Sequence, residues 1–84
     1  MELKKQPEKY ILSVGNKISK TLLDALDDLS EWKGDIVQIK GTKYYRLKIH
    51  KYRFVFTYDS TIDIICVEEI NTRTNINYRE WFKK

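Results

Sequence analysis

The sequence predicts an α+β fold: an N-terminal helical hairpin packed on one face of a small twisted, mostly antiparallel sheet. Two patterns support this prediction. Apolar residues recur at spacings of three and four before Gly34, which is the helical period, and at a spacing of two after it, which is the strand period. With 84 residues, the chain makes one domain, 1–84. A domain of this size buries roughly 60% of its unfolded surface, so its core is small.

The N-terminal segment predicts one short helix. Residues 2–5 are too few to classify alone and could form a short edge strand. Pro7 suits the first turn of a helix, where its missing N–H costs nothing, and the helix is expected to continue to Val14. Gly15 and Asn16 then end it, because both tolerate a left-handed backbone.

The following segment is the clearest helix in the sequence. Its apolar stripe consists of Ile18, Leu22, Leu26, Leu29 and Trp32. The opposite face carries mostly acids, which is typical of a solvated helix surface; they are Asp24, Asp27, Asp28 and Glu31. The helix is expected to end near Lys33 and Gly34.

The rest of the chain predicts an antiparallel meander. The expected strands begin at Ile36 and then cover Tyr45 to Ile49, Tyr52 to Tyr58 and Ile62 to Ile70. Turns are expected at Gly41-Thr42, His50-Lys51 and Asp59-Ser60-Thr61. From Asn71 onward the chain is expected to be irregular. Because the helices precede the strands, we expect them on one face of the sheet and the other face to be open.

The charge distribution is the strongest functional signal. Between Ile36 and Tyr58 there is no acidic residue but six basic ones: Lys40, Lys43, Arg46, Lys48, Lys51 and Arg53. Strand alternation places Arg46 and Lys48 on one side, about 6–7 Å apart, and a turn at His50 brings Arg53 beside them. Such a face is suited to a polyanion. The alternative is an ordinary solvated face with scattered bases.

The composition excludes several classes of chemistry. One histidine, one cysteine and scattered acids form no metal ligand set, and no glycine-rich phosphate loop is present, so we expect no metal and no cofactor. Cys66 alone cannot form an intramolecular disulfide and is interpreted as a small core residue. Neither a membrane span nor a signal peptide is evident, which favours a cytoplasmic protein.

The remaining groups suit one reaction. RNA carries its own nucleophile, the 2′-OH, so cleavage needs a group that takes this proton, cations that hold the phosphate, and an acid for the 5′-oxygen. DNA has no such nucleophile. A cationic, metal-free and acid-poor site therefore favours RNA as the substrate. His50 is the one histidine of the sequence and could donate or accept a proton, and it is either part of this site or simply a solvated turn residue.

Several segments together resemble the RelE/ParE superfamily of bacterial type II toxin–antitoxin toxins. The segments are Gly34-Asp35-Ile36, Ile39-Lys40-Gly41, Tyr45-Arg46-Leu47-Lys48-Ile49, Lys51-Tyr52-Arg53-Phe54-Val55-Phe56, Ile70-Asn71-Thr72-Arg73 and Tyr78. This resemblance implies the helical-hairpin-on-sheet fold given above. It also implies a ribosome-dependent, metal-independent endoribonuclease, an mRNA interferase that cuts mRNA by 2′-OH attack and inhibits translation.

The resemblance also implies residue roles. Arg53 would hold the phosphate, Arg46 and Lys48 would stabilise charge, Arg73 would assist the leaving group, and Tyr78 would stack on a base or assist proton transfer. Because an arginine does not act as a base near neutral pH, the base role falls to Lys48, Tyr78 or His50. The candidates for RNA binding are Lys40, Lys43, His50 and Lys51. His50 stands where the family commonly has a glycine.

The partners implied by the resemblance are a cognate antitoxin, the ribosome and mRNA. Two further hypotheses remain at this point. One is a non-enzymatic DNA gyrase inhibitor similar to ParE. The other is a catalytically decayed module that binds a nucleic acid or a protein partner.

Overall fold

The structure is a computed structural model, and it describes residues 1–82. Its elements, in chain order, are β1 (Glu2–Leu3), α1 (Lys5–Ser13), α2 (Asn16–Ser30), β2 (Asp35–Gln38), β3 (Tyr45–Ile49), β4 (Tyr52–Asp59), β5 (Ile64–Thr72) and α3 (Tyr78–Phe82). The five strands form one mixed sheet in the order β1-β5-β4-β3-β2. β1 runs parallel to β5, and the other neighbours are antiparallel.

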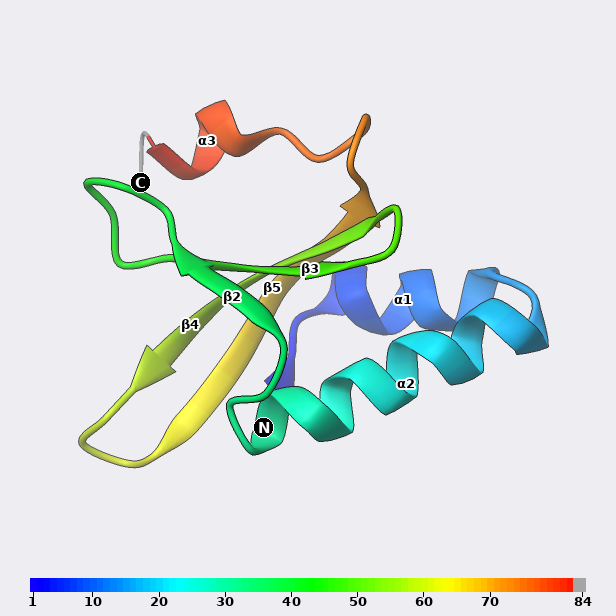
Figure 1. The fold of residues 1–84 in the computed structure, drawn as a ribbon, viewed down its shortest axis with the longest axis horizontal. Helices are drawn as coiled ribbons and strands as arrows, with labels where there is room; N and C mark the ends of the chain where they lie inside the picture. Colours follow the sequence, from blue (N-terminus) through cyan, green and yellow to red (C-terminus); the bar gives the residue numbers. More distant parts are fainter. Residues whose placement is uncertain (83–84) are drawn as a thin grey trace.

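The main core lies between the sheet and the pair α1 and α2, which cover one face (Figure 1). Alternation along β4 turns Phe54 and Phe56 toward the helices, and both are fully buried. Leu22 and Leu29 meet them from α2 and are equally buried. The predicted apolar stripe of the second helix therefore faces the sheet, which explains why this helix forms there.

A second, smaller core lies on the other face, where α3 crosses the sheet (Figure 1). Val55 is fully buried there, beneath the rings of Tyr44 and Trp81, whose centroids are 4.9 Å apart. The indole Nε1–H of Trp81 donates a 2.8 Å hydrogen bond to the Glu69 carboxylate of β5. These contacts fix α3 and the loop between β2 and β3 on this face.

The second core corrects the predicted fold class. A helical hairpin on one face of a mostly antiparallel sheet does not describe this chain, because α3 covers part of the other face and β1 makes the sheet mixed. The expectation that residues from Asn71 onward are irregular is also wrong. β5 continues to Thr72, and α3 follows it. The strands, not the helices, dominate the chain after Ser30.

The helix α2 ends earlier than the sequence predicted, and the reason is a Schellman motif. The Trp32 N–H donates to the Leu29 carbonyl at 2.8 Å, and the Lys33 N–H donates to the Asp28 carbonyl at 2.9 Å. Trp32 occupies the left-handed position with φ 59°, where glycine is usual. Gly34, the residue expected to end the helix, is favoured for another reason: it has φ 126°, which other residues rarely adopt, and a Cβ there would lie 2.7 Å from Leu47 Cδ1.

The predicted hairpin between β3 and β4 is confirmed. Ile49 pairs with Tyr52, so His50 and Lys51 form a two-residue loop. His50 has φ 51°, the left-handed conformation that glycine adopts most easily. The strand Tyr45–Ile49 also forms as predicted, and the N-terminal segment, which the sequence did not classify, forms the edge strand β1. The strand predicted over Ile62 to Ile70 corresponds to β5, which begins two residues later than expected, at Ile64.

A cationic cleft as candidate functional site

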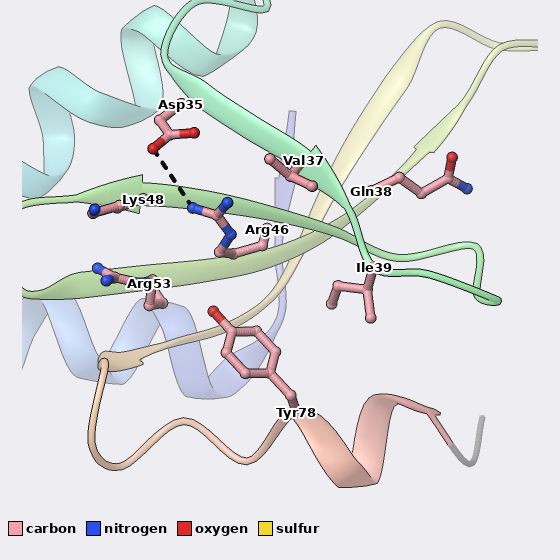
Figure 2. Close-up of a pocket in the computed structure, with 8 residues that line it drawn as sticks. All are labelled: Asp35, Val37, Gln38, Ile39, Arg46, Lys48, Arg53 and Tyr78. Atoms are coloured by element: carbon pink, nitrogen blue, oxygen red, sulfur yellow. Dashed lines mark ion pairs between the residues drawn. The ribbon is translucent and has the colours of Figure 1, made fainter.

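A cleft of about 510 Å³ opens on the second face of the sheet, between β2, β3, β4 and α3. We call it the cationic cleft. It is lined by Asp35, Val37, Gln38, Ile39, Arg46, Lys48, Arg53 and Tyr78. Figure 2 shows the basic side chains coming from two neighbouring strands, with the Tyr78 ring standing over them from α3. Three bases therefore share a cleft with one acid.

Strand register explains why the bases meet. Lys48 of β3 lies directly opposite Arg53 of β4, and Arg46 lies opposite the buried Val55. Alternation then puts Arg46, Lys48 and Arg53 on the face away from α1 and α2, as the sequence predicted. Like charges directly opposite each other destabilise an antiparallel pair. The repulsion between Lys48 and Arg53 thus lowers the stability of the fold, and this favours a role for the two residues in binding a ligand.

The Arg53 guanidinium is oriented by the hairpin beside it. Its Nη1 donates to the carbonyl oxygens of Tyr52 at 2.8 Å and His50 at 3.0 Å. Neutral carbonyl groups hold the side chain without cancelling its charge. A guanidinium has five N–H donors in a fixed fork, so further donors remain for an anion.

Asp35 is the acidic residue of the cationic cleft. Its Oδ2 lies 3.8 Å from Arg46 Nη1, a long contact drawn as the dashed line in Figure 2. The Asp35 side chain is 57% exposed and that of Arg46 is 22% exposed. Because exposed ion pairs at such distances are weak, Asp35 neutralises Arg46 only in part. The cleft remains positively charged.

The Tyr78 hydroxyl is the least satisfied polar group in the cleft. Its oxygen is buried and has no hydrogen-bond partner within the described residues. In Figure 2 this hydroxyl points toward the strands that carry Arg46 and Arg53. Burial raises the pKa of Tyr78 above 10.0, although Arg46 and Arg53 counteract the effect. The phenol therefore keeps its proton at neutral pH and serves as a donor.

The structure brings together some of the predicted site residues and separates others. Arg46, Lys48, Arg53 and Tyr78 share the cationic cleft. Arg73 does not line it: this residue is exposed, and its backbone N–H donates to the Lys51 carbonyl at 2.7 Å. Of the five residues with predicted catalytic roles, Arg73 is therefore the one that does not line the cationic cleft.

The residues predicted to bind RNA fall into two groups. Lys40 and Lys43 line a neighbouring cleft, which shares Gln38 with the cationic cleft. His50 and Lys51 form the exposed turn between β3 and β4 and do not line the cationic cleft. Lys40 and Lys43 therefore extend the basic surface beside the cationic cleft, whereas His50 and Lys51 lie outside it.

Sequence reasoning missed the acid and the apolar floor of the cleft. Asp35 pairs with Lys48, and Val37 pairs with Arg46, across β2 and β3. Asp35 directly precedes the acid-free stretch, so its position was visible in the sequence. Only the register shows that β2 folds back beside the bases and returns a negative charge to them.

The cleft is suited to holding an anion. Its chemistry consists of two guanidinium groups, one ammonium group and one phenolic donor, which are the groups that bind phosphates. Among residues 1–82, no group of three or more His, Cys, Asp or Glu side chains could hold a metal ion. No helix in this part of the chain is long and apolar enough to cross a membrane.

Comparison with known proteins finds similarity in structure alone. No family model and no curated protein matches the sequence. A chain of the archaeal RelE–RelB complex from Pyrococcus horikoshii OT3 matches with a TM-score of 0.71 and 19% identity, over 89% of this chain and 94% of that chain. A chain of the RelB–RelE antitoxin–toxin complex from Methanococcus jannaschii matches with a TM-score of 0.70 and 22% identity, over 88% and 92%.

These findings correct the identification made from the sequence. Both solved structures hold RelB together with RelE, and one is an antitoxin–toxin complex, so the likeness does not select a RelE-like toxin. At 19% and 22% identity, it shows a shared fold alone. The interpretation of this chain as a RelE-like, ribosome-dependent mRNA interferase is therefore wrong.

Proposed function

We propose that this chain is one member of a toxin–antitoxin pair and that its cationic cleft binds single-stranded RNA through a phosphodiester group. One observation carries the RNA-binding part of the proposal: Arg46, Lys48 and Arg53 line a single cleft with the unpartnered hydroxyl of Tyr78. The shared fold with chains of two RelE–RelB complexes supports the other part.

The phosphate-binding step follows from the geometry of the bases. Arg53 is held by the hairpin carbonyls, and Lys48 lies directly opposite it. A bound phosphodiester would relieve the repulsion between these two cations, and their donors would reach its oxygens. Arg46 adds a third positive charge on the same face. Binding would therefore depend strongly on salt.

Single-stranded RNA is favoured by the other groups in the cleft. The Tyr78 ring can stack on an unpaired base, and its hydroxyl can donate to the phosphate. Gln38 has an amide oxygen that can accept a hydrogen bond from a ribose 2′-OH. A base held in a duplex would not be free to stack on the ring.

The cleft supports binding better than proton abstraction. Arginine does not act as a base near neutral pH, and the raised pKa of Tyr78 keeps the phenol protonated. Of the two other candidate bases, His50 lies in the turn outside the cleft, which leaves Lys48 as the candidate base within it. That the chain is an enzyme stays a prediction, as does a cytoplasmic location.

A protein partner is part of the proposal. Structures with this fold come from complexes of two different proteins. We expect the partner to be encoded next to this chain. Co-expression of the adjacent reading frame with this chain, followed by purification through a tag on one of them, tests this directly. Recovery of this chain alone would count against a pair.

RNA binding is tested by fluorescence anisotropy with a labelled oligoribonucleotide of ten uridines. Arg53→Gln is expected to weaken binding by roughly 10-fold, because it removes a hydrogen-bonded charge from the phosphate. Asp35→Asn is expected to strengthen binding, because it removes the acid of the cleft. The matched control is Arg79→Gln. Arg79 follows Tyr78 in the chain and is exposed, but it does not line the cleft.

Equal losses for Arg53→Gln and Arg79→Gln would contradict the proposed site, because they would indicate diffuse attraction to the whole basic chain. The DNA oligonucleotide of the same length and sequence tests the preference for ribose. Equal affinity for DNA and RNA would overturn the proposed contact of Gln38 with the 2′-OH.

A further inference from the structure

A second cleft, of about 530 Å³, lies on the helix-covered side of the sheet, where α2 ends beside the hairpin of β4 and β5. Its walls are aromatic and its rim is acidic. It is lined by Ser30, Glu31, Trp32, Tyr45, Tyr58, Asp63 and Ile65. None of the described residues that line it is basic. We call it the aromatic cleft.

The rings of the aromatic cleft form a corner. The Trp32 ring is 5.2 Å from that of Tyr45 at 82° and 5.5 Å from that of Tyr58 at 63°. Trp32 is 43% exposed and Tyr58 is 38% exposed, so part of both rings faces solvent. The exposed faces of aromatic rings attract cations because their π-electrons are negatively charged.

The backbone holds two of the lining residues in an uncommon conformation. Trp32 has φ 59° and Asp63 has φ 54°. A bulky side chain at positive φ is rare, and residues kept in such conformations are concentrated at binding sites. Trp32 takes the place at which a glycine usually ends a helix, so the helix end itself does not require its ring.

The negative charge of the aromatic cleft is focused on Asp63. Its Oδ1 accepts a 2.8 Å hydrogen bond from the Tyr58 hydroxyl, which fixes the carboxylate beside the ring. The pKa of Tyr58 is raised by this hydrogen bond, by burial and by the nearby charges of Asp63 and Asp59. Glu31 also lines the cleft, although Lys33 forms a 2.7 Å ion pair with it.

We propose that the aromatic cleft binds an arginine side chain of a partner protein, with the guanidinium against the Trp32 ring and its N–H groups donating to Asp63. A planar guanidinium fits this site because it stacks on aromatic rings and pairs with a carboxylate at the same time. The anionic rim disfavours phosphate, so this site is distinct from the cationic cleft and independent of its function.

The test is an NMR titration of the ¹⁵N-labelled chain with the capped peptide acetyl-Gly-Arg-Gly-amide. The indole N–H resonance of Trp32 is expected to shift with saturation. Trp81, whose indole already donates to Glu69, serves as an internal reference and should not move. The matched probe is the same peptide with citrulline, which has nearly the shape of arginine but no charge.

Three variants locate the interaction. Asp63→Asn keeps a residue that tolerates positive φ and removes the charge, and it should raise the dissociation constant roughly 2- to 5-fold. Trp32→Leu, followed through the Asp63 amide, should weaken binding by a similar factor of roughly 2- to 5-fold. Ile62→Ala changes an exposed residue outside the aromatic cleft and should have no effect.

Two results would overturn the proposal. If the citrulline peptide shifts Trp32 as strongly as the arginine peptide, the cleft does not recognise a cation. If Trp32 does not respond, or Asp63→Asn leaves the preference for arginine unchanged, the aromatic corner is only part of the packing at the end of α2.

Discussion

Replacing Tyr78 by phenylalanine should stabilise the protein. The substitution removes a buried hydroxyl that has no hydrogen-bond partner among residues 1–82, and it leaves the ring packed against the second core. An unsatisfied buried polar group costs about 1–3 kcal/mol. Because Tyr78 is only partly buried as a residue, we expect the low end, about 1 kcal/mol. For a domain of this size, that raises the melting temperature by about 4–8 °C.

The same change should weaken RNA binding. If the hydroxyl donates to a phosphate oxygen, its removal costs one hydrogen bond to a charged acceptor, or about 10-fold in affinity at the low end of the usual range. The assays are thermal unfolding followed by circular dichroism and the anisotropy titration with decauridine. Higher stability combined with lower affinity is the outcome that a ligand-directed hydroxyl predicts.

The outcome that would refute this reasoning is the reverse combination. A less stable Tyr78→Phe variant with unchanged affinity would show that the hydroxyl is satisfied within the free protein. The pH dependence gives a second check. Because the folded state raises the pKa of Tyr78 above 10.0, ionisation of this phenol opposes folding, so the free energy of unfolding is unaffected by it below pH 10 and falls as the pH rises through the folded pKa. This loss should be smaller in the Tyr78→Phe variant.

Three further outcomes are expected. Phe54→Ala empties a fully buried position between sheet and helices and should cost about 3–5 kcal/mol in urea unfolding; a cost below 1 kcal/mol would contradict the assigned core. His50→Gly relieves a left-handed backbone and should stabilise by up to about 1 kcal/mol, without changing RNA affinity; lower affinity would place His50 at the site. Burial and Glu68 raise the pKa of the Cys66 thiol. At pH 8 this thiol should therefore react with Ellman's reagent more slowly than glutathione does. An equal rate would show an accessible thiolate.

The strands and the basic face could be predicted because they depend on local patterns. Alternation alone places Arg46 and Lys48 on one side of β3. The two-residue hairpin fixes the register, and register places Arg53 directly opposite Lys48. These residues are close in sequence, so no long-range information was needed to bring them together.

The residues that the sequence misplaced depend on contacts between distant segments. α3 is only five residues long, and its position depends on Trp81, which meets Glu69 and Tyr44 from other elements. A helix that short has no periodic signal strong enough to predict. Arg73 follows β5 directly, and its backbone N–H is bonded to the carbonyl of Lys51 in the turn between β3 and β4.

The end of α2 shows a different limitation. Glycine is the usual residue at the left-handed position of a Schellman motif, so the sequence pointed to Gly34. The structure places Trp32 there, because its ring packs on Tyr45, Phe56 and Tyr58. Tertiary packing therefore outweighs the local preference. The family identification from the sequence was wrong for a related reason. Short motifs on a basic strand suggested a specific function, whereas the comparisons show a shared fold, and one fold serves many functions.

The salt dependence of RNA affinity tests the central claim most directly. For single-stranded RNA, each phosphate contact contributes about 0.7 to the slope of log affinity against log salt concentration. Because the three bases of the cationic cleft hold one phosphodiester group, neutralising them should reduce the magnitude of that slope by about 0.7. The control removes three other exposed positive charges and should leave the slope unchanged. The two variants to compare are Arg46→Gln/Lys48→Gln/Arg53→Gln and Lys17→Gln/Lys20→Gln/Arg79→Gln. Equal reductions in both would contradict a phosphate site on this face of the sheet.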